Sequence, residues 1–409
     1  MDTGIATDGG DIESDISRLE ILKALERKVL WHAMWTIHNA NHVRDSRDNL
    51  KVGGHQASCA SVATLMTALY FDVMRPQDRV AVKPHASPIF HAIQYMMGRQ
   101  SRDALERFRA YGGAQSYPSR TKDSDEVDFS TGSVGLGVAM TLFASMVQDY
   151  VQLHNLVQDP EVTAQGLGRM ISIVGDAELD EGNIYEAMLE GWKYDVRNLW
   201  WIIDYNRQSL DGVVSDGLFR KIQEFFKTVD WQVVTLKYGK KLQRQFARTG
   251  GDVLEKWIDD CPNGLYSALT FKGQSGEPGV WRERLKLDLK GVAGIKDILE
   301  DHDDRDLHQL MTNLAGQDME SVLEAFHSVK DDRPHCFIAY TVKGYGTPLA
   351  GHKDNHAGLM TPEQMGRFKA EHGIADGKEW ELFEQAGLPA ERLRKYVQGV
   401  AFNAPGSRI

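Results

Sequence analysis

A strand–helix–strand segment constrains the fold of this chain more than any other part of its sequence. The apolar run ISIV (171–174) ends at a Gly-Asp pair containing Asp176, and a second run, LWWII (199–203), leads to Asn206. Between the two runs, apolar residues recur at helical spacing over 184–189. Two apolar strands joined by such a helix form a right-handed βαβ unit, so both strand ends should lie at one edge of a parallel sheet. The sequence therefore predicts an α/β fold with a ligand site at that edge.

The residue types at the two strand ends suggest the chemistry of the site. The Asp176 carboxylate and the Asn206 side-chain amide supply hard oxygen atoms, which Mg²⁺ prefers together with phosphate oxygens and water. We expect a helix to begin near Glu178 and to direct its free N–H groups toward the same edge, as in other anion sites. These groups together predict a diphosphate bridged by Mg²⁺. An ordinary turn and strand exit would contain the same residues, so this pattern alone leaves both interpretations open.

Polar residues recur in other loops that precede helices or follow strands. The segment GGHQASC places His55 and Ser58 at a predicted helix start, and KPHASP places His85 at a strand exit. A buried strand in HCFIAYTVKGYG is followed by Lys343. Each histidine alone is more typical of a cap or a surface residue. Together with Asp176 and Asn206, however, they indicate one site.

Composition limits the class of protein. With 409 residues, 42% hydrophobic and 26% charged, the chain has the composition of a globular protein, and its net charge of −11 argues against a nucleic-acid partner. Its three widely spaced cysteines fit a reducing cytoplasm better than a disulfide or zinc framework. Residues 1–15 are acidic and glycine-rich, so we expect a flexible tail and no signal peptide. The long uncharged stretches 53–71 and 129–148 contain polar residues and predict buried helices, with no membrane span.

Six stretches occur in an order that resembles a known enzyme family. These are GGHQAS, HASP, SYP followed by SVGLG, GDAELDE, NRQSLDG and AYTVKGYG, and together they extend from about residue 19 to 346. They resemble the thiamine-diphosphate-binding half of the homodimeric type of pyruvate dehydrogenase E1 component and, more distantly, the N-terminal domain of transketolases. The resemblance implies a three-layer α/β/α thiamine-diphosphate-binding fold with a mostly parallel central sheet. It assigns residues 16–349 to the cofactor domain and 350–409 to a C-terminal loop and helical extension.

The same resemblance implies a set of site residues. Mg²⁺ would be held by Asp176, the Asn206 side chain and the backbone carbonyl of Gln208. The histidines nearest the reacting carbonyl, and so the expected catalytic ones, would be His55, His85 and His356. The implied cofactor-binding residues are His55, Ser58, His85, Ser133, Val134, Gly175, Asp176, Ala177, Glu178, Asn206 and Lys343.

The chain departs from the family pattern in three ways. The usual Gly-Asp-Gly is Gly-Asp-Ala here, so Ala177 must adopt a backbone conformation that a Cβ permits. Family E1 chains are about twice as long, and their second thiamine-type domain supplies the glutamate that activates the aminopyrimidine ring. The N-terminal region with which they dock on an acyltransferase core is reduced to about 15 residues, which leaves membership of a large complex open.

We therefore expect an enzyme whose active site is completed by a partner. The partner would carry the pyrimidine-binding and C-terminal transketolase-type domains, in an α₂β₂ assembly. The leading reaction is decarboxylation of a 2-oxo acid with transfer of the acyl or aldehyde unit, and the alternative is transketolase-type ketol transfer between sugars. A non-catalytic cofactor-fold subunit is a further alternative, suggested by Ala177. A metal hydrolase using His352 and His356 is the weakest, because no carboxylate partner is evident.

Overall fold

A five-stranded parallel sheet forms the centre of the protein, as the βαβ pattern predicts. The computed structural model describes residues 16–46, 48, 50–157, 166–208 and 217–403. The predicted tail at 1–15 and the last residues of the NRQSLDG stretch lie outside these ranges. The strands pair in the order β1-β2-β3-β5-β4, and every pairing is parallel. Their bounds are β1 Arg79–Ala81, β2 Met170–Gly175, β3 Leu199–Tyr205, β4 Gln232–Leu236 and β5 His335–Tyr340.

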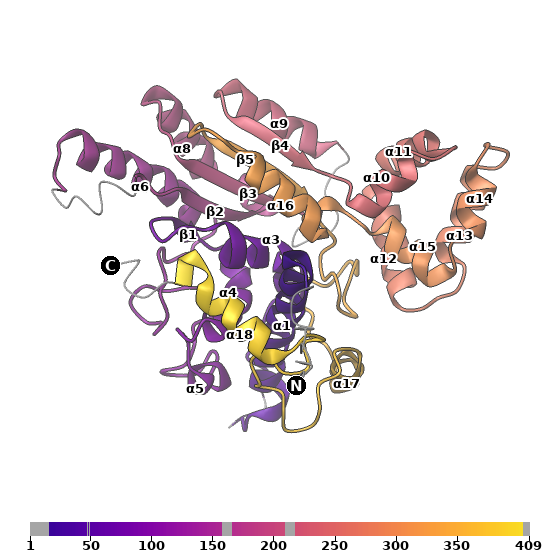
Figure 1. Cartoon of the computed structure of the whole chain (residues 1–409), viewed down its shortest axis with the longest axis horizontal. Coiled ribbons are helices and arrows are strands. Elements are labelled where there is room, and N and C mark those ends of the chain that lie inside the picture. Colours follow the sequence, from indigo (N-terminus) through magenta and orange to yellow (C-terminus); the bar gives the residue numbers. More distant parts are fainter. Residues whose placement is uncertain (1–15, 47, 49, 158–165, 209–216, 404–409) are drawn as a thin grey trace, which may run out of the picture.

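Helices cover both faces of the sheet, so the fold has the predicted three layers (Figure 1). Successive side chains of a strand point to opposite faces. Trp200 and Ile202 accordingly lie in one buried cluster, while Trp201 and Ile203 lie in another. The first cluster includes helices α1 (Arg18–His38), α3 (Ala63–Ala68), α4 (Ser87–Met96) and α16 (Met319–Ser328), and the second α6 (Leu136–Leu153), α8 (Gly182–Lys193) and α9 (Leu218–Thr228).

Short elements connect these helices to the strands near the predicted site. The expected buried helix at 53–71 forms only from Gln56 onward, as three successive pieces that are buried from residue 56 to 71. His85 lies in a turn of 3₁₀ helix after β1, and Pro88 lies in the first turn of α4. The connecting elements are η1 Asn39–Val43, α2 Gln56–Ser61, η2 Leu69–Val73, η3 Pro84–Ala86 and α5 Arg102–Glu106.

A group of helices follows β4 and stands to one side of the sheet (Figure 1). The sequence predicts mixed helices for 240–318, and the structure confirms them. The chain returns through a 3₁₀ turn and α16 to β5, whose end lies before Lys343. The group comprises α10 Lys240–Phe246, α11 Gly251–Asp260, α12 Asn263–Gln274, α13 Val280–Asp288, α14 Ile295–Glu300 and α15 Asp304–Met311, followed by η5 Ala315–Gln317.

The C-terminal residues pack against the first helix. Lys28 and Trp31 on α1 donate hydrogen bonds to the carbonyl oxygens of Glu381 (2.7 Å) and Glu379 (2.8 Å). Helix α17 (Pro362–Glu371) lies where the sequence predicts it. The predicted helix over 377–398 is wrong in its first half, because α18 (Ala390–Gly399) begins only after Pro389, and the last short element is η6 Ala401–Asn403. Within the described ranges, none of the helices is both long and apolar enough to span a membrane.

Candidate functional site

A cavity of ≈ 380 Å³ lies at the carboxyl ends of the central strands. Carboxyl ends of parallel strands are the usual ligand-binding edge of an open α/β sheet. Most residues predicted for the site converge here, although they come from segments as far apart in sequence as 58 and 356. The predicted residues that line the cavity are Ser58, His85, Val134, Gly175, Asp176, Ala177, Glu178, Asn206, Gln208, Lys343 and His356.

Asp176 is the most constrained of the predicted metal ligands. Its two carboxylate oxygens accept backbone hydrogen bonds, one from Ala177 (3.0 Å) and one from Arg207 (2.7 Å). Burial, with the nearby charge of Asp204, raises the pKa of Asp176 to about 7. A buried carboxylate whose ionised form is disfavoured in this way is stabilised by a cation brought next to it.

The predicted metal ligands after β3 are held at the same edge. The Asn206 side-chain oxygen accepts a hydrogen bond from the backbone N–H of Gln208 (3.1 Å). The Gln208 carbonyl faces the Lys343 ammonium, whose Nζ lies 3.3 Å away. Asp176, Asn206 and Gln208 thus contribute a carboxylate, an amide oxygen and a backbone carbonyl to one buried region, and this donor set fits Mg²⁺.

Asp204 anchors this edge, a role that the sequence did not reveal. Its carboxylate is fully buried and accepts hydrogen bonds from Lys83 (2.6 Å), Ser61 (2.7 Å), the Asn206 side-chain N–H (3.0 Å) and Thr341. Burial opposes ionisation, but the ion pair with Lys83 and the hydrogen bonds outweigh it and lower the pKa of Asp204. Because Asp204 accepts from the Asn206 amide nitrogen, the amide oxygen is fixed on the other side. The sequence feature that could have revealed this role is a charged residue inside an otherwise apolar strand.

Lys343 brings a positive charge to the same cavity. The side chain is buried, and burial together with the charge of Lys83 lowers its pKa to about 8. Its Nζ contacts the Gln208 carbonyl and lies 3.3 Å from Nδ1 of His356. A cation beside the expected metal ligands suits a diphosphate oxygen.

The three predicted histidines meet at the cavity. The rings of His55 and His85 stack with centroids 3.8 Å apart, and the His356 ring lies edge-on to both at 5.3 and 5.1 Å. Burial, reinforced by the neighbouring histidines, lowers the pKa of both His55 and His85 to about 3. These two imidazoles are therefore neutral at physiological pH and can accept or donate a hydrogen bond.

The expected helix start near Glu178 is wrong. Residues Asp176–Asp180 form a 3₁₀ turn, and α8 begins only at Gly182. The Glu178 carboxylate accepts the backbone N–H groups of Gly175 (2.9 Å) and Gly135 (3.0 Å). Glu178 thus ties the loop after β2 to the loop before α6.

The predicted residues near the Glu178–Gly135 hydrogen bond differ in whether they line the cavity. Val134 lines it, whereas Ser133 is exposed and does not. His55 also lies outside the lining and contacts two residues of it, by stacking on His85 and lying edge-on to His356. Ala177 is not among the described residues with positive φ, so the Gly-Asp-Ala sequence imposes no left-handed strain.

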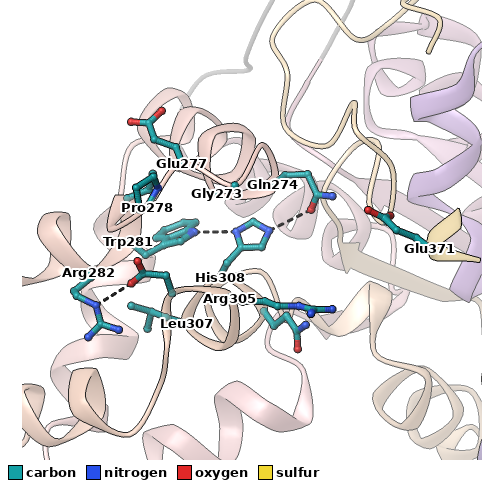
Figure 2. A pocket seen from close by; sticks show the side chains of 15 residues that line it. Gly273, Gln274, Glu277, Pro278, Trp281, Arg282, Arg305, Leu307, His308 and Glu371 are labelled. Carbon is teal, nitrogen blue, oxygen red and sulfur yellow. Dashed lines mark hydrogen bonds and ion pairs between the residues drawn. The ribbon is translucent and has the colours of Figure 1, made fainter. Parts of the chain in front are cut away.

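A larger cleft of ≈ 790 Å³ lies among helices α12, α13 and α15 (Figure 2). Several of its polar groups bond to one another. Trp281 donates to Nδ1 of His308 (3.1 Å), the other ring nitrogen of His308 faces Gln274 (3.3 Å), and Arg282 pairs with Asp304 (2.9 Å). The strand-end cavity is the better candidate, since it gathers most of the predicted site residues at the carboxyl ends of the parallel strands.

The arrangement does not favour the hydrolase interpretation. His352 packs its ring edge-on against Phe271 at 4.6 Å, and its Nδ1 accepts a hydrogen bond from Asp354. His356 groups with His55 and His85 instead. The two histidines predicted for a hydrolase are therefore directed to different surroundings.

Comparison with known proteins identifies the class of this fold. Residues 53–247 match the family described as "Transketolase, thiamine diphosphate binding domain". The fold is that of transketolases. The transketolase of Pichia stipitis in complex with sedoheptulose-7-phosphate superposes with a TM-score of 0.63 at 16% identity, over 94% of this chain and 44% of that one. The Campylobacter jejuni transketolase superposes with a TM-score of 0.60 at 17% identity, over 94% and 46%.

The sequence comparison gives a narrower group of relatives. The chain is 27% identical over 400 residues to the pyruvate dehydrogenase E1 component of Cupriavidus necator, covering 92% of this chain and 42% of that protein. It is 25% identical over 352 residues to the E1 component of Escherichia coli K12, covering 83% and 37%. The chain is thus a relative of the thiamine-diphosphate-dependent E1 components and transketolases, and it spans less than half the length of these curated relatives.

Proposed function

We propose that this chain binds the diphosphate of thiamine diphosphate through Mg²⁺ and serves a 2-oxo acid decarboxylase of the pyruvate dehydrogenase E1 type. The observation that carries the proposal is the meeting of Asp176, Asn206 and the Gln208 carbonyl with Lys343 in one cavity at the sheet edge. The cofactor, when bound, supplies stabilisation of a carbanion on the substrate. In this proposal residues 16–349 form the cofactor domain and 350–409 an extension.

The residues of the chain would divide the work between binding and proton handling. Asp176, Asn206 and Gln208 would hold the metal, while Lys343 would neutralise a diphosphate oxygen. His55, His85 and His356 would donate hydrogen bonds to an oxygen of the 2-oxo acid and carry protons at their ring nitrogens. The remaining cofactor residues would be Ser58, Ser133, Val134, Gly175, Ala177 and Glu178.

We also propose that a partner completes the active site. The partner would carry the pyrimidine-binding and C-terminal domains; this chain itself matches 42% and 37% of the length of two E1 relatives. Two copies of each chain would form an α₂β₂ assembly. A cytoplasmic location remains a prediction from the cysteine pattern.

Calorimetric titration tests the binding part of this proposal. Thiamine diphosphate should bind the full chain only when Mg²⁺ is present, and a concentration 100 times the dissociation constant should add about 2.7 kcal/mol to the free energy of unfolding. Thiamine without phosphates should bind far more weakly. Asp176→Asn should abolish the Mg²⁺ dependence, whereas Asp252→Asn, an exposed carboxylate on α11, should not. Equal binding with and without Mg²⁺ would overturn the metal assignment.

The reaction is tested in the assembled enzyme. Release of CO₂ from pyruvate would support decarboxylation, and transfer of a ketol unit between sugar phosphates would support the transketolase alternative. The non-catalytic alternative requires that Asp176→Asn leave activity unchanged while the assembly stays intact.

A further inference from the structure

A buried histidine lies at the centre of a polar cluster that the proposed function does not use. His91 is on α4, the helix that begins just after His85. Its side chain is fully buried, and so are the carboxylates of Asp123 and Asp125, which come from the loop between α5 and α6. Charged groups are buried together only when they are paired and hydrogen-bonded. The contacts of the ring therefore indicate its charge.

Both ring nitrogens of His91 face acceptors. Nδ1 lies 2.7 Å from an oxygen of Asp125, and Nε2 lies 3.1 Å from the carbonyl oxygen of Gln115. A carbonyl oxygen only accepts, so Nε2 carries a proton. The Asp125 oxygen also accepts a hydrogen bond from Gln100 (2.9 Å), and imidazole is a stronger base than a carboxylate, so the proton between Nδ1 and Asp125 lies on the ring. His91 is therefore a buried imidazolium.

The charges around the ring favour this protonated form. Asp125 lies beside Nδ1, and an oxygen of Asp123 lies 3.9 Å from Nε2. Burial opposes the imidazolium, but the charge and hydrogen bond of Asp125, together with the charge of Asp123, outweigh it and raise the pKa of His91. Helices α1, α2 and α3 also pack against α4, but they contribute no charge of comparable strength. The next charged residue of the loop, Glu126, pairs instead with Arg99 (2.9 Å).

The same carboxylates give the loop its shape. Asp123 accepts the backbone N–H groups of Gln115 (2.8 Å) and Ser119 (2.8 Å), so it closes the chain around Tyr117. We call residues 115–125 the Tyr117 loop. Because the loop presents two carboxylates and a carbonyl oxygen to α4, a cation on the helix is needed to join the two.

The Tyr117 loop extends from α4 to the wall of the cavity. The Tyr117 ring lies 6.0 Å from the ring of His85, measured between centroids. The carbonyl oxygen of Pro118 accepts the backbone N–H of Thr131 (3.2 Å), and the chain continues from there to Val134, which lines the cavity. A change in how the loop is held on α4 would therefore be felt at the cavity.

We propose that His91 is a positioning residue whose imidazolium clamps the Tyr117 loop onto α4 and so holds it beside the histidines of the cavity. The proposal deepens the proposed function and rests on it for the role of the loop next to a cofactor, but the clamp itself needs no cofactor. A neutral ring donates from one nitrogen only, so one of the two hydrogen bonds to the loop is then lost. Because folding raises the pKa, the clamp is complete below about pH 6.5 and is lost as the pH rises through the folded-state pKa.

Nuclear magnetic resonance of the full chain, with ¹⁵N in the histidine rings, tests the charge. Both ring nitrogens of His91 should be protonated at pH 7, and the titration midpoint should lie above about 6.5. His91→Gln identifies the signal by its absence. Asp125→Asn should lower the midpoint, whereas Asp72→Asn, which removes a buried carboxylate beside His327, should not. A neutral His91 ring at pH 7 would overturn the proposal.

Limited digestion with trypsin tests the clamp. Arg120 and Lys122 are exposed in the Tyr117 loop. As the pH rises through the midpoint found for His91, cleavage at these residues should increase about tenfold relative to a short reference peptide, because losing a hydrogen bond to a charged group populates the open loop. His91→Gln should be cleaved rapidly on both sides of the midpoint. His327→Gln, which also removes a histidine paired with a carboxylate, should behave like the wild type.

Three results of the digestion would contradict the clamp. These are cleavage of the wild type that does not change across the midpoint, protection of His91→Gln equal to that of the wild type, and protection that depends on added Zn²⁺, since a metal ion would then join the ring to the carboxylates. If circular dichroism shows His91→Gln unfolded, the pH dependence of the wild type and the Asp125→Asn midpoint still decide the outcome. Failure of thiamine diphosphate to bind would leave all these results unchanged, so the two failures are distinguishable.

Discussion

The Asp204–Lys83 pair should control both the stability of the fold and the geometry of the metal site. Asp204 is fully buried, and Lys83 is only 4% exposed. Asp204→Asn removes the charge with almost no change in shape and leaves a buried ammonium without its carboxylate. Breaking a buried ion pair in this way costs about 3–5 kcal/mol. We expect a loss of this size in the free energy of unfolding, measured by urea titration.

The same substitution should weaken Mg²⁺ binding without touching a predicted ligand. The Asp204 carboxylate fixes the Asn206 amide because it can only accept a hydrogen bond from the amide nitrogen. An asparagine at 204 can also donate, so the Asn206 oxygen loses its fixed orientation. Changes to groups that orient metal ligands typically cost about 10- to 100-fold in metal affinity. Calorimetric titration of Mg²⁺ with thiamine diphosphate would measure this loss.

Asp78→Asn is the matched control for this experiment. Asp78 is an equally buried carboxylate that pairs with Arg169 and Arg75, but it precedes β1 at the opposite edge of the sheet. The Asp78→Asn substitution should destabilise the fold and leave the Mg²⁺ affinity unchanged. The reasoning is refuted if Asp204→Asn lowers the free energy of unfolding by less than about 1 kcal/mol, or if both variants change Mg²⁺ affinity equally.

Two further predictions concern residues outside the cavity lining. Burial lowers the pKa of His32 to about 3, so the folded state resists protonation, and stability should fall as pH drops below about 6.5. Between pH 7.5 and pH 5, the free energy of unfolding of the wild type should fall by about 2 kcal/mol more than that of His32→Gln. Equal pH dependence of the two proteins would contradict this prediction. Arg207 has φ 64° and donates its backbone N–H to Asp176, and its guanidinium lies over the Tyr266 ring at 4.6 Å. Arg207→Val should weaken Mg²⁺ binding more than Arg207→Gly. At this positive φ a β-branched residue is strained by about 1–2 kcal/mol, whereas glycine is not. The reverse order would exclude backbone strain as the cause.

Much of the site could be predicted because parallel strands bring their carboxyl ends to one edge. Asp176, Asn206 and Lys343 each follow an apolar strand, so their proximity follows from the order of strands and helices along the chain. His85 follows the same rule, and His55 was recognisable from the loop before a helix. The hydrogen bond between Glu178 and the backbone N–H of Gly135 could not be predicted, because Gly135 lies 43 residues earlier in the chain.

The sequence by itself determined the βαβ unit, the parallel sheet and the residue types at its edge, because apolar periodicity and strand order are local properties. Only the tertiary structure decided that Asp204 pairs with Lys83, that Glu178 binds two backbone N–H groups, and that one face of α6 stays exposed. Contacts between distant residues have no local signal. An apolar helix has the same composition whether it is fully or half buried, so only the packed structure shows which face stays exposed.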